Sequence, residues 1–166
     1  METNRKRIIV ISIVTLFLAL TSFSVAWAEE YDAMKGVNHT DVIFDMRDGI
    51  PEIAVEHIKL IHDTFKQLTA MKKNPVFVVV FMGSAVKLIS SDHSGFNAEE
   101  KKHLKELAGT ISKMSKDGID FEVCLAAVEY FGVDPASIQS EMKHVPNGWI
   151  SEIGYQARGY KLVPVY

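Results

Sequence analysis

The only cysteine of the chain, Cys124, lies where the sequence predicts that a strand ends and a helix begins. The residues of Ile119–Val123 alternate between apolar and acidic side chains, a period of two that is typical of a strand. The alanine-rich residues after Cys124 predict a short helix that ends at Gly132. The unpaired N–H groups and the positive dipole end of a helix favour a thiolate over a thiol. Cys124 is therefore the candidate reactive residue.

A structural role for Cys124 is the alternative to a reactive one. Unpaired cysteines are among the most buried residues and often serve as small hydrophobic side chains. The position between a strand and a helix favours chemistry, because ligands collect at that edge of open α/β sheets. The sequence leaves both interpretations open.

Several polar residues and glycines follow other predicted strands and would share one edge of the sheet with Cys124. If the strands are parallel, their carboxyl ends meet at a common rim. Glycines there would leave backbone N–H groups open to an anion or a persulfide, although ordinary turn chemistry also explains them. These candidate substrate-binding residues are Asp45, Gly83, Ser84, Asn147 and Gly148.

Alternation of strands and helices along the chain predicts an α/β fold. The run Val76–Met82 is continuously apolar and β-branched, which is typical of a strand covered on both faces. Between the strands, apolar residues recur at helical spacing after Pro51, and Asn97 with Glu100 forms a capping-box pattern. The order β-α-β-α-β-α-β-α-β predicts a three-layer α/β/α sandwich with a mostly parallel five-stranded sheet. The predicted strands are Asp41–Met46, Val76–Met82, Ile119–Cys124, Met142–Val145 and Tyr160–Val165.

The first 28 residues have the three parts of a secretory signal peptide. A basic segment, Arg5–Arg7, precedes the apolar run Ile8–Leu20, and Ala26-Trp-Ala28 resembles a cleavage site. We expect cleavage after Ala28 and a periplasmic protein; an uncleaved membrane anchor is the alternative. Residues 29–40 then form a flexible leader with room for a short edge strand near Tyr31–Val37, and residues 41–166 form one domain.

Composition and motifs exclude several classes of function. The chain has 166 residues and a formal net charge of −3, without the basic run or aromatic motif of a nucleic-acid-binding protein. It has no P-loop or Rossmann glycine motif, so we expect no cofactor. The six histidines do not combine with Cys124 at a zinc-binding spacing, so we expect no metal. His144 precedes a rim turn and is either a base for Cys124 or an exposed strand-end residue.

Motifs across most of the chain resemble the DsrE/DsrF-like family, in its small exported form. The order and spacing of the motifs carry the resemblance, from the first strand and its turn to the closing segment. They are Val42-Ile-Phe-Asp-Met-Arg-Asp-Gly49, Phe77-Val-Val-Val-Phe-Met-Gly-Ser-Ala-Val86, Gly118-Ile-Asp-Phe-Glu-Val-Cys124, Phe131-Gly-Val133, Val145-Pro-Asn-Gly148, Gln156-Ala-Arg-Gly-Tyr160 and Val163-Pro164. The resemblance implies a three-layer domain that forms homo-oligomers, either trimers or hexamers.

The resemblance also implies a function in sulfur relay. Cys124 matches the cysteine that accepts sulfane sulfur as a persulfide and passes it to a partner thiol, so a sulfur donor or acceptor protein would be a partner. Leu125 stands where the family commonly has a small residue, and we expect it to narrow access to the sulfur. The resemblance thus implies a sulfurtransferase or sulfur carrier. A non-catalytic oligomeric scaffold with a structural cysteine, or a thiol redox sensor, are the alternatives.

Overall fold

A computed structural model describes residues 31–166 of the chain. The predicted signal peptide and its cleavage site lie outside the described residues. A 3-10 turn, η1 (Asp32–Met34), stands where the sequence allowed a short edge strand, so that expectation was wrong. Gly36 follows with a positive φ of 76°, a turn conformation that an extended strand does not contain. Within the described residues, no helix is long and apolar enough to cross a membrane.

Five parallel strands form one sheet in the order β4-β3-β2-β1-β5. This sheet and the helices around it confirm the predicted α/β fold. In the register, Met46 pairs with Phe81, and Phe81 pairs with Val123, so three strands end at the same level. The residues that follow them therefore share one edge. The strands are β1 (Thr40–Met46), β2 (Pro75–Phe81), β3 (Asp120–Cys124), β4 (Met142–Val145) and β5 (Lys161–Val165).

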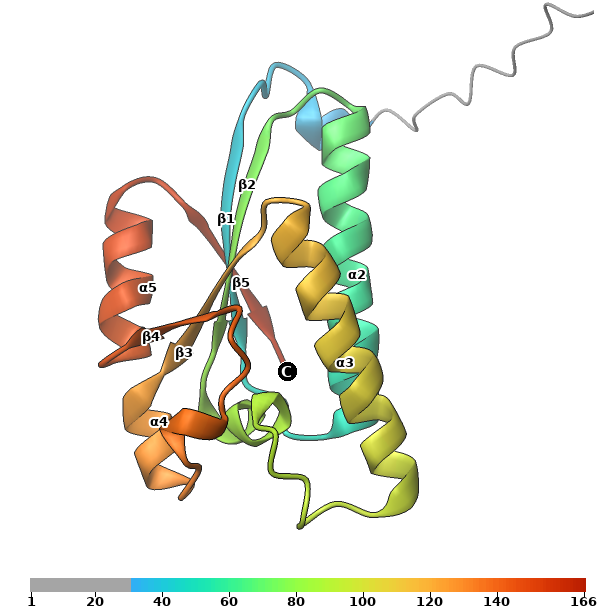
Figure 1. Cartoon of the computed structure of the whole chain (residues 1–166). Coiled ribbons are helices and arrows are strands. Elements are labelled where there is room, and N and C mark those ends of the chain that lie inside the picture. The colour runs from blue at the N-terminus through green and yellow to red at the C-terminus, as the bar shows by residue number, and fades with distance from the viewer. Residues whose placement is uncertain (1–30) are drawn as a thin grey trace, which may run out of the picture. The chain divides into compact units, whose positions relative to one another are not determined.

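Helices cover both faces of the sheet (Figure 1). The long helices α2 (Pro51–Ala70) and α3 (Ala98–Lys116) lie side by side on one face, and α5 (Gly148–Ala157) lies on the other. The short helix α4 (Leu125–Tyr130) and the 3-10 helix η2 (Gly83–Ile89) lie at the carboxyl edge of the sheet. One further 3-10 turn, η3 (Pro135–Ser137), precedes β4.

Local sequence explains where the two long helices begin. Pro51 occupies the first turn of α2, where its missing N–H costs nothing. At the start of α3, the side chain of Asn97 accepts hydrogen bonds from the Glu99 and Glu100 amides, and the Glu100 carboxylate accepts one from the Asn97 amide at 2.7 Å. The predicted capping box is thus present, and it fixes where α3 starts.

The two faces of the sheet bury different kinds of side chain. The core on the side of α2 and α3 is large and apolar. Alternate residues of the strands, such as Phe44, Phe77 and Val123, are buried in it. Toward α5 the apolar cluster is small: Ile43, Val78, Val80, Met82 and Cys124. The buried carboxylates of Asp45 and Glu122 belong to this second face, since β-strand residues two apart point the same way. The reactive groups of the sheet therefore lie on the side that a single helix covers.

Candidate functional site

Cys124 is the last residue of β3 and the residue that precedes the first turn of α4. Its exposed fraction is 6%, so the sulfur lies just below the surface. The Gly148 amide, which opens α5, donates a hydrogen bond to Cys124 Sγ over 3.2 Å. A sulfur hydrogen-bonded to the first amide of a ten-residue helix sits in the positive end of the helix dipole, which stabilises negative charge on sulfur.

Two neighbours in sequence hold the Gly148 amide in that position. The Asn147 side chain accepts a hydrogen bond from the Trp149 amide at 3.0 Å and so caps α5. Gly148 itself packs so tightly that a β-carbon would lie 2.3 Å from Met82 Sδ and 3.1 Å from Cys124 Cβ. Glycine is thus needed at position 148 for the helix to approach the cysteine.

Cys124 lines a cavity of about 420 Å³ at the carboxyl edge of the sheet. The structure brings three of the predicted site residues together there: Cys124, Gly83 and Asn147. Leu125 is not among the lining residues, whereas the small residues Ala126 and Ala127 are. The expectation that Leu125 narrows access to the sulfur therefore finds no support in the cavity walls. The lining residues are Arg47, Met82, Gly83, Cys124, Ala126, Ala127, Tyr130, Phe131, Asn147 and Trp149.

Asp45 does not line this cavity, but it holds a residue that does. Its carboxylate is 5% exposed and accepts from Arg47 Nε at 2.8 Å and 2.7 Å. Glu152 of α5 lies beside this pair and is also buried. Burial first, and then the Asp45 carboxylate, raise the pKa of Glu152 to about 7, while Arg47 acts in the opposite direction. The two buried acids and the partly exposed Arg47 guanidinium thus form a cluster at the end of β1.

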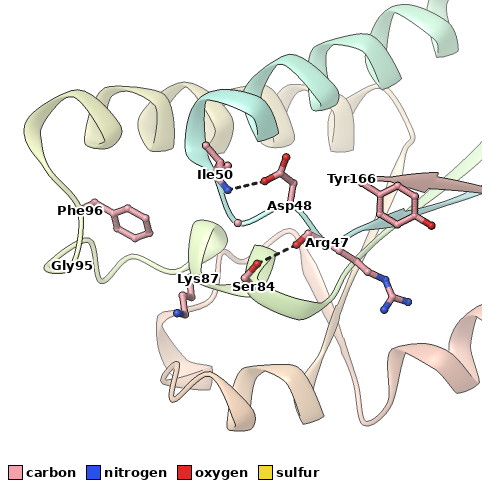
Figure 2. A pocket seen from close by; sticks show the side chains of 9 residues that line it. Arg47, Asp48, Ile50, Ser84, Lys87, Gly95, Phe96 and Tyr166 are labelled. Atoms are coloured by element: carbon pink, nitrogen blue, oxygen red, sulfur yellow. Dashed lines mark hydrogen bonds between the residues drawn. The ribbon is translucent and has the colours of Figure 1, made fainter.

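Ser84 lies in a neighbouring hollow of about 710 Å³ and not in the cysteine cavity (Figure 2). Its hydroxyl donates to the Arg47 carbonyl oxygen at 3.2 Å, which ties η2 to the turn after β1. In the same hollow the Asp48 carboxylate accepts from the Ile50 amide at 2.9 Å. Figure 2 shows the Arg47 guanidinium directed away from Asp48 and Ser84. Arg47 therefore lines both the cysteine cavity and the hollow of Ser84, but its guanidinium points away from Ser84.

A second buried carboxylate lies under α5, at the middle of β3. Glu122 is 3% exposed, and its carboxylate accepts hydrogen bonds from the hydroxyls of Ser151 and Tyr155, the latter at 2.9 Å. Burial first, and then the hydrogen bond to Glu122, raise the pKa of Tyr155 to about 12. Because both donors belong to α5, this network fixes the helix against the sheet.

His144 lies on β4 opposite Val123 and is exposed, and it is not part of the cavity wall. The structure therefore gives no support to His144 as a base for Cys124. Within residues 31–166, no group of three or more His, Cys, Asp or Glu side chains stands close enough to hold a metal. The sequence predicted Asp45 as a site residue but not Arg47, which lies two residues later at the same rim. The position of Arg47 directly after β1 could have indicated that it belongs to the site.

A scan against family models matches residues 57–165, which include β2 to β5 but not β1, to the DsrE/DsrF-like family. The chain belongs to the DsrE/DsrF-like family. This family is linked to sulfur relay. The match includes Cys124 and the walls of its cavity apart from Arg47, which lies before residue 57.

The relatives of this DsrE/DsrF-like chain show its fold and leave its reaction open. An uncharacterized protein of Aquifex aeolicus is 23% identical over 123 residues, which cover 74% of this chain and 54% of that protein. This chain thus spans about half the length of that relative. A protein of unknown function from Methanobacterium thermoautotrophicum superposes with a TM-score of 0.56 at 18% identity, over 75% of this chain and 98% of that one. Another from Bacteroides thetaiotaomicron gives 0.53 at 17% identity, over 75% and 94%.

Proposed function

We propose that this chain is a periplasmic sulfur carrier or sulfurtransferase that holds sulfane sulfur as a persulfide on Cys124. The single observation that carries the proposal is the position of Cys124, whose sulfur accepts the Gly148 amide hydrogen bond and which lines a cavity. The cavity walls are largely apolar, and they would shield a persulfide from water and from reductants. Membership of a family linked to sulfur relay supports the same function.

The reaction needs no external oxidant. The Cys124 thiolate attacks the sulfane sulfur of a donor R–S–SH, a new S–S bond forms at Sγ, and the donor S–S bond breaks. The donor leaves as a thiolate with the electron pair, and Cys124 carries the extra sulfur. For transfer, an acceptor thiolate attacks the outer sulfur, and Cys124 leaves as a thiolate. The N–H of Gly148 stabilises the sulfur anion at the start and at the end of the cycle.

Intact mass spectrometry tests this function. The chain is incubated with polysulfide or with thiosulfate and weighed, then treated with a small thiol and weighed again. We expect a mass gain in whole sulfur units that the thiol removes, and no gain in Cys124→Ser. If Cys124 gains no sulfur from either donor, the function is wrong.

A structural cysteine is the second candidate, and its burial is the observation that favours it. Cys124 is only 6% exposed and packs with Ile43, Val78, Val80 and Met82. Thiol labelling separates the two candidates. A reactive cysteine in an open cavity is modified in the native protein by a small methanethiosulfonate reagent. A purely structural one is labelled only after unfolding.

We also propose that the chain assembles with copies of itself through the outer face of α5. Three large apolar side chains are exposed there: Trp149 at 57%, Ile150 at 69% and Ile153 at 66%. Such clustered apolar residues are typical of protein interfaces. Light scattering should give a trimer or hexamer that Ile150→Glu dissociates. Leu60→Glu, a change at an equally exposed leucine on α2, should leave the assembly intact.

A further inference from the structure

Among the described residues 31–166, Arg47 is the one charged side chain that lines the cysteine cavity. The guanidinium is fixed on one side, because Nε contacts both carboxylate oxygens of the buried Asp45. These contacts use one of the five N–H donors of an arginine. The Arg47 side chain is 37% exposed and lines the cavity, so a ligand in the cavity can contact it.

The surroundings of Arg47 suit the recognition of an anion. None of the described residues that line the cavity carries a carboxylate, and the nearby acids Asp45 and Glu152 are not among them. Asp45 is already committed to Nε, and it holds the planar guanidinium in one orientation. A guanidinium fixed by a buried carboxylate binds a sulfonate or carboxylate with two parallel hydrogen bonds, at little further cost in side-chain entropy.

We propose that Arg47 makes the cysteine cavity selective for anionic sulfur donors, small molecules that carry a sulfonate or carboxylate beside the sulfane sulfur. This inference rests on the proposed function, since it names the substrate class of the same cysteine. A thiolate that attacks an anionic donor meets like-charge repulsion, and a fixed cation beside the path offsets that repulsion.

Thiosulfate is the simplest donor of this class, and its reaction balances without a further reactant. The Cys124 thiolate attacks the outer sulfur of thiosulfate, and a bond forms between that sulfur and Cys124 Sγ. The S–S bond of thiosulfate breaks, and sulfite leaves with the electron pair. In the proposed reaction the N–H donors of Arg47, which lines the same cavity, stabilise the negative charge that grows on the leaving sulfite.

The test compares an anionic donor with an uncharged one. Rates of Cys124 modification are measured with thiosulfate and with dimethyl trisulfide, on the full chain and on Arg47→Met and Arg47→Lys. We expect Arg47→Met to lower the rate with thiosulfate at least about tenfold relative to the rate with dimethyl trisulfide. Arg47→Lys keeps a charge for Asp45 but lacks the planar fork, so it should lose an intermediate amount.

Lys87→Met is the matched control for the effect of removing any positive charge nearby. Lys87 Nζ lies 4.9 Å from the ring of Phe131, a wall of the cavity, but Lys87 itself is not part of that wall. We expect this variant to change the two rates by the same factor. An equal change of both rates in Arg47→Met as well would overturn the inference and leave the proposed function standing.

A binding measurement separates the inference from the chemistry. In Cys124→Ser, which cannot react, Trp149 reports occupancy because it lines the cavity and is the only tryptophan in the sequence after the predicted cleavage at Ala28. We expect thiosulfate to change its fluorescence in a saturable way, and Arg47→Met to abolish the change. Binding without sulfur transfer would reject the proposed function alone. No binding, together with rates that are independent of Arg47, would reject the selectivity.

Discussion

Gly148 and Met82 approach each other so closely that a β-carbon on Gly148 would lie 2.3 Å from the methionine sulfur. The contact joins the start of α5 to the residue after β2, and Cys124 lies against the same glycine. The arrangement of the cysteine site therefore depends on a residue that has no side chain.

Replacement of Gly148 by alanine should disturb both stability and the site. The added methyl group must displace Met82 or the first turn of α5, which costs about 1–3 kcal/mol in a packed region. Displacement of α5 also withdraws the amide from Cys124 Sγ. We expect a lower urea midpoint and slower reaction of the native thiol with a small methanethiosulfonate reagent.

Gly154 in the same helix provides the matched control. A β-carbon there would meet no atom within 4 Å, so Gly154→Ala should not clash. Alanine is the better helix former, and we expect stabilisation of about 0.5–1 kcal/mol with unchanged thiol reactivity. If both alanine variants behaved alike, the close packing at Gly148 would not control the site.

Backbone patterns account for how well the fold could be predicted. Of the continuous apolar run Val76–Met82, Phe77–Met82 are buried as expected and Val76 is exposed, and the capping box at Asn97 marks the start of α3. Parallel topology then places the strand ends on one edge, which is why Gly83, Asn147 and Cys124 meet. These features follow from local periodicity and from the geometry of parallel sheets.

The long polar side chains are what the sequence could not place. Alternation in β3 predicted a strand but did not show what covers its acidic side chains; α5 covers Glu122 and supplies hydroxyl donors from Ser151 and Tyr155. In the same way, backbone topology placed Asp45 at the rim but said nothing of the reach of Arg47 into the cysteine cavity. Such contacts depend on tertiary packing of side chains rather than on their spacing in sequence.

Removal of the Tyr155 hydroxyl should lower the free energy of unfolding, because the buried Glu122 carboxylate loses a hydrogen-bond donor. Tyr155→Phe deletes a donor at 2.9 Å, while Lys143 Nζ lies 3.9 Å away and cannot replace it at hydrogen-bond distance. An under-satisfied buried carboxylate costs about 1–3 kcal/mol, which urea unfolding measures. Tyr160→Phe is the control, because the Tyr160 hydroxyl has no hydrogen-bond partner within the described residues. A similar loss of stability in Tyr160→Phe would show that the hydrogen bond to Glu122 is not the cause.

Glu152 should make stability depend on pH. Its pKa of about 7 in the folded protein lies above the ordinary value of 4.5, so the folded state holds a proton that the unfolded state releases. The free energy of unfolding should therefore fall as pH rises from 4.5 to about 7, and this contribution should be constant at higher pH. With allowance for screening by water near the site, the fall is on the order of 1–2 kcal/mol.

Urea titrations at about pH 5 and about pH 8, on either side of this transition, measure the effect. Glu152→Gln cannot ionise and should lose most of the difference between the two conditions. Glu99→Gln serves as the control, because Glu99 is an exposed acid whose pKa is lowered by a hydrogen bond to Lys102. A wild-type difference that persists in Glu152→Gln would show that another group is responsible.

The contact between His62 and Asp117 should stabilise the pairing of the two long helices. His62 Nε2 on α2 lies 2.7 Å from Asp117 Oδ2 at the end of α3, and the His62 side chain is only 5% exposed. A double-mutant cycle with His62→Leu and Asp117→Ala isolates this pair from the separate effect on the helix end. We expect a coupling free energy of about 1–2 kcal/mol, because one partner is buried.

The exposed pair of Asp63 and Lys66 on α2 is the comparison that tests whether burial strengthens the contact between His62 and Asp117. Its atoms are 2.8 Å apart, nearly the same distance as in the buried pair, but the two side chains are 59% and 50% exposed. The same cycle there should give about 0.5 kcal/mol or less, since water and salt screen exposed ion pairs. Equal coupling in the two cycles would mean that burial of His62 does not strengthen its contact with Asp117.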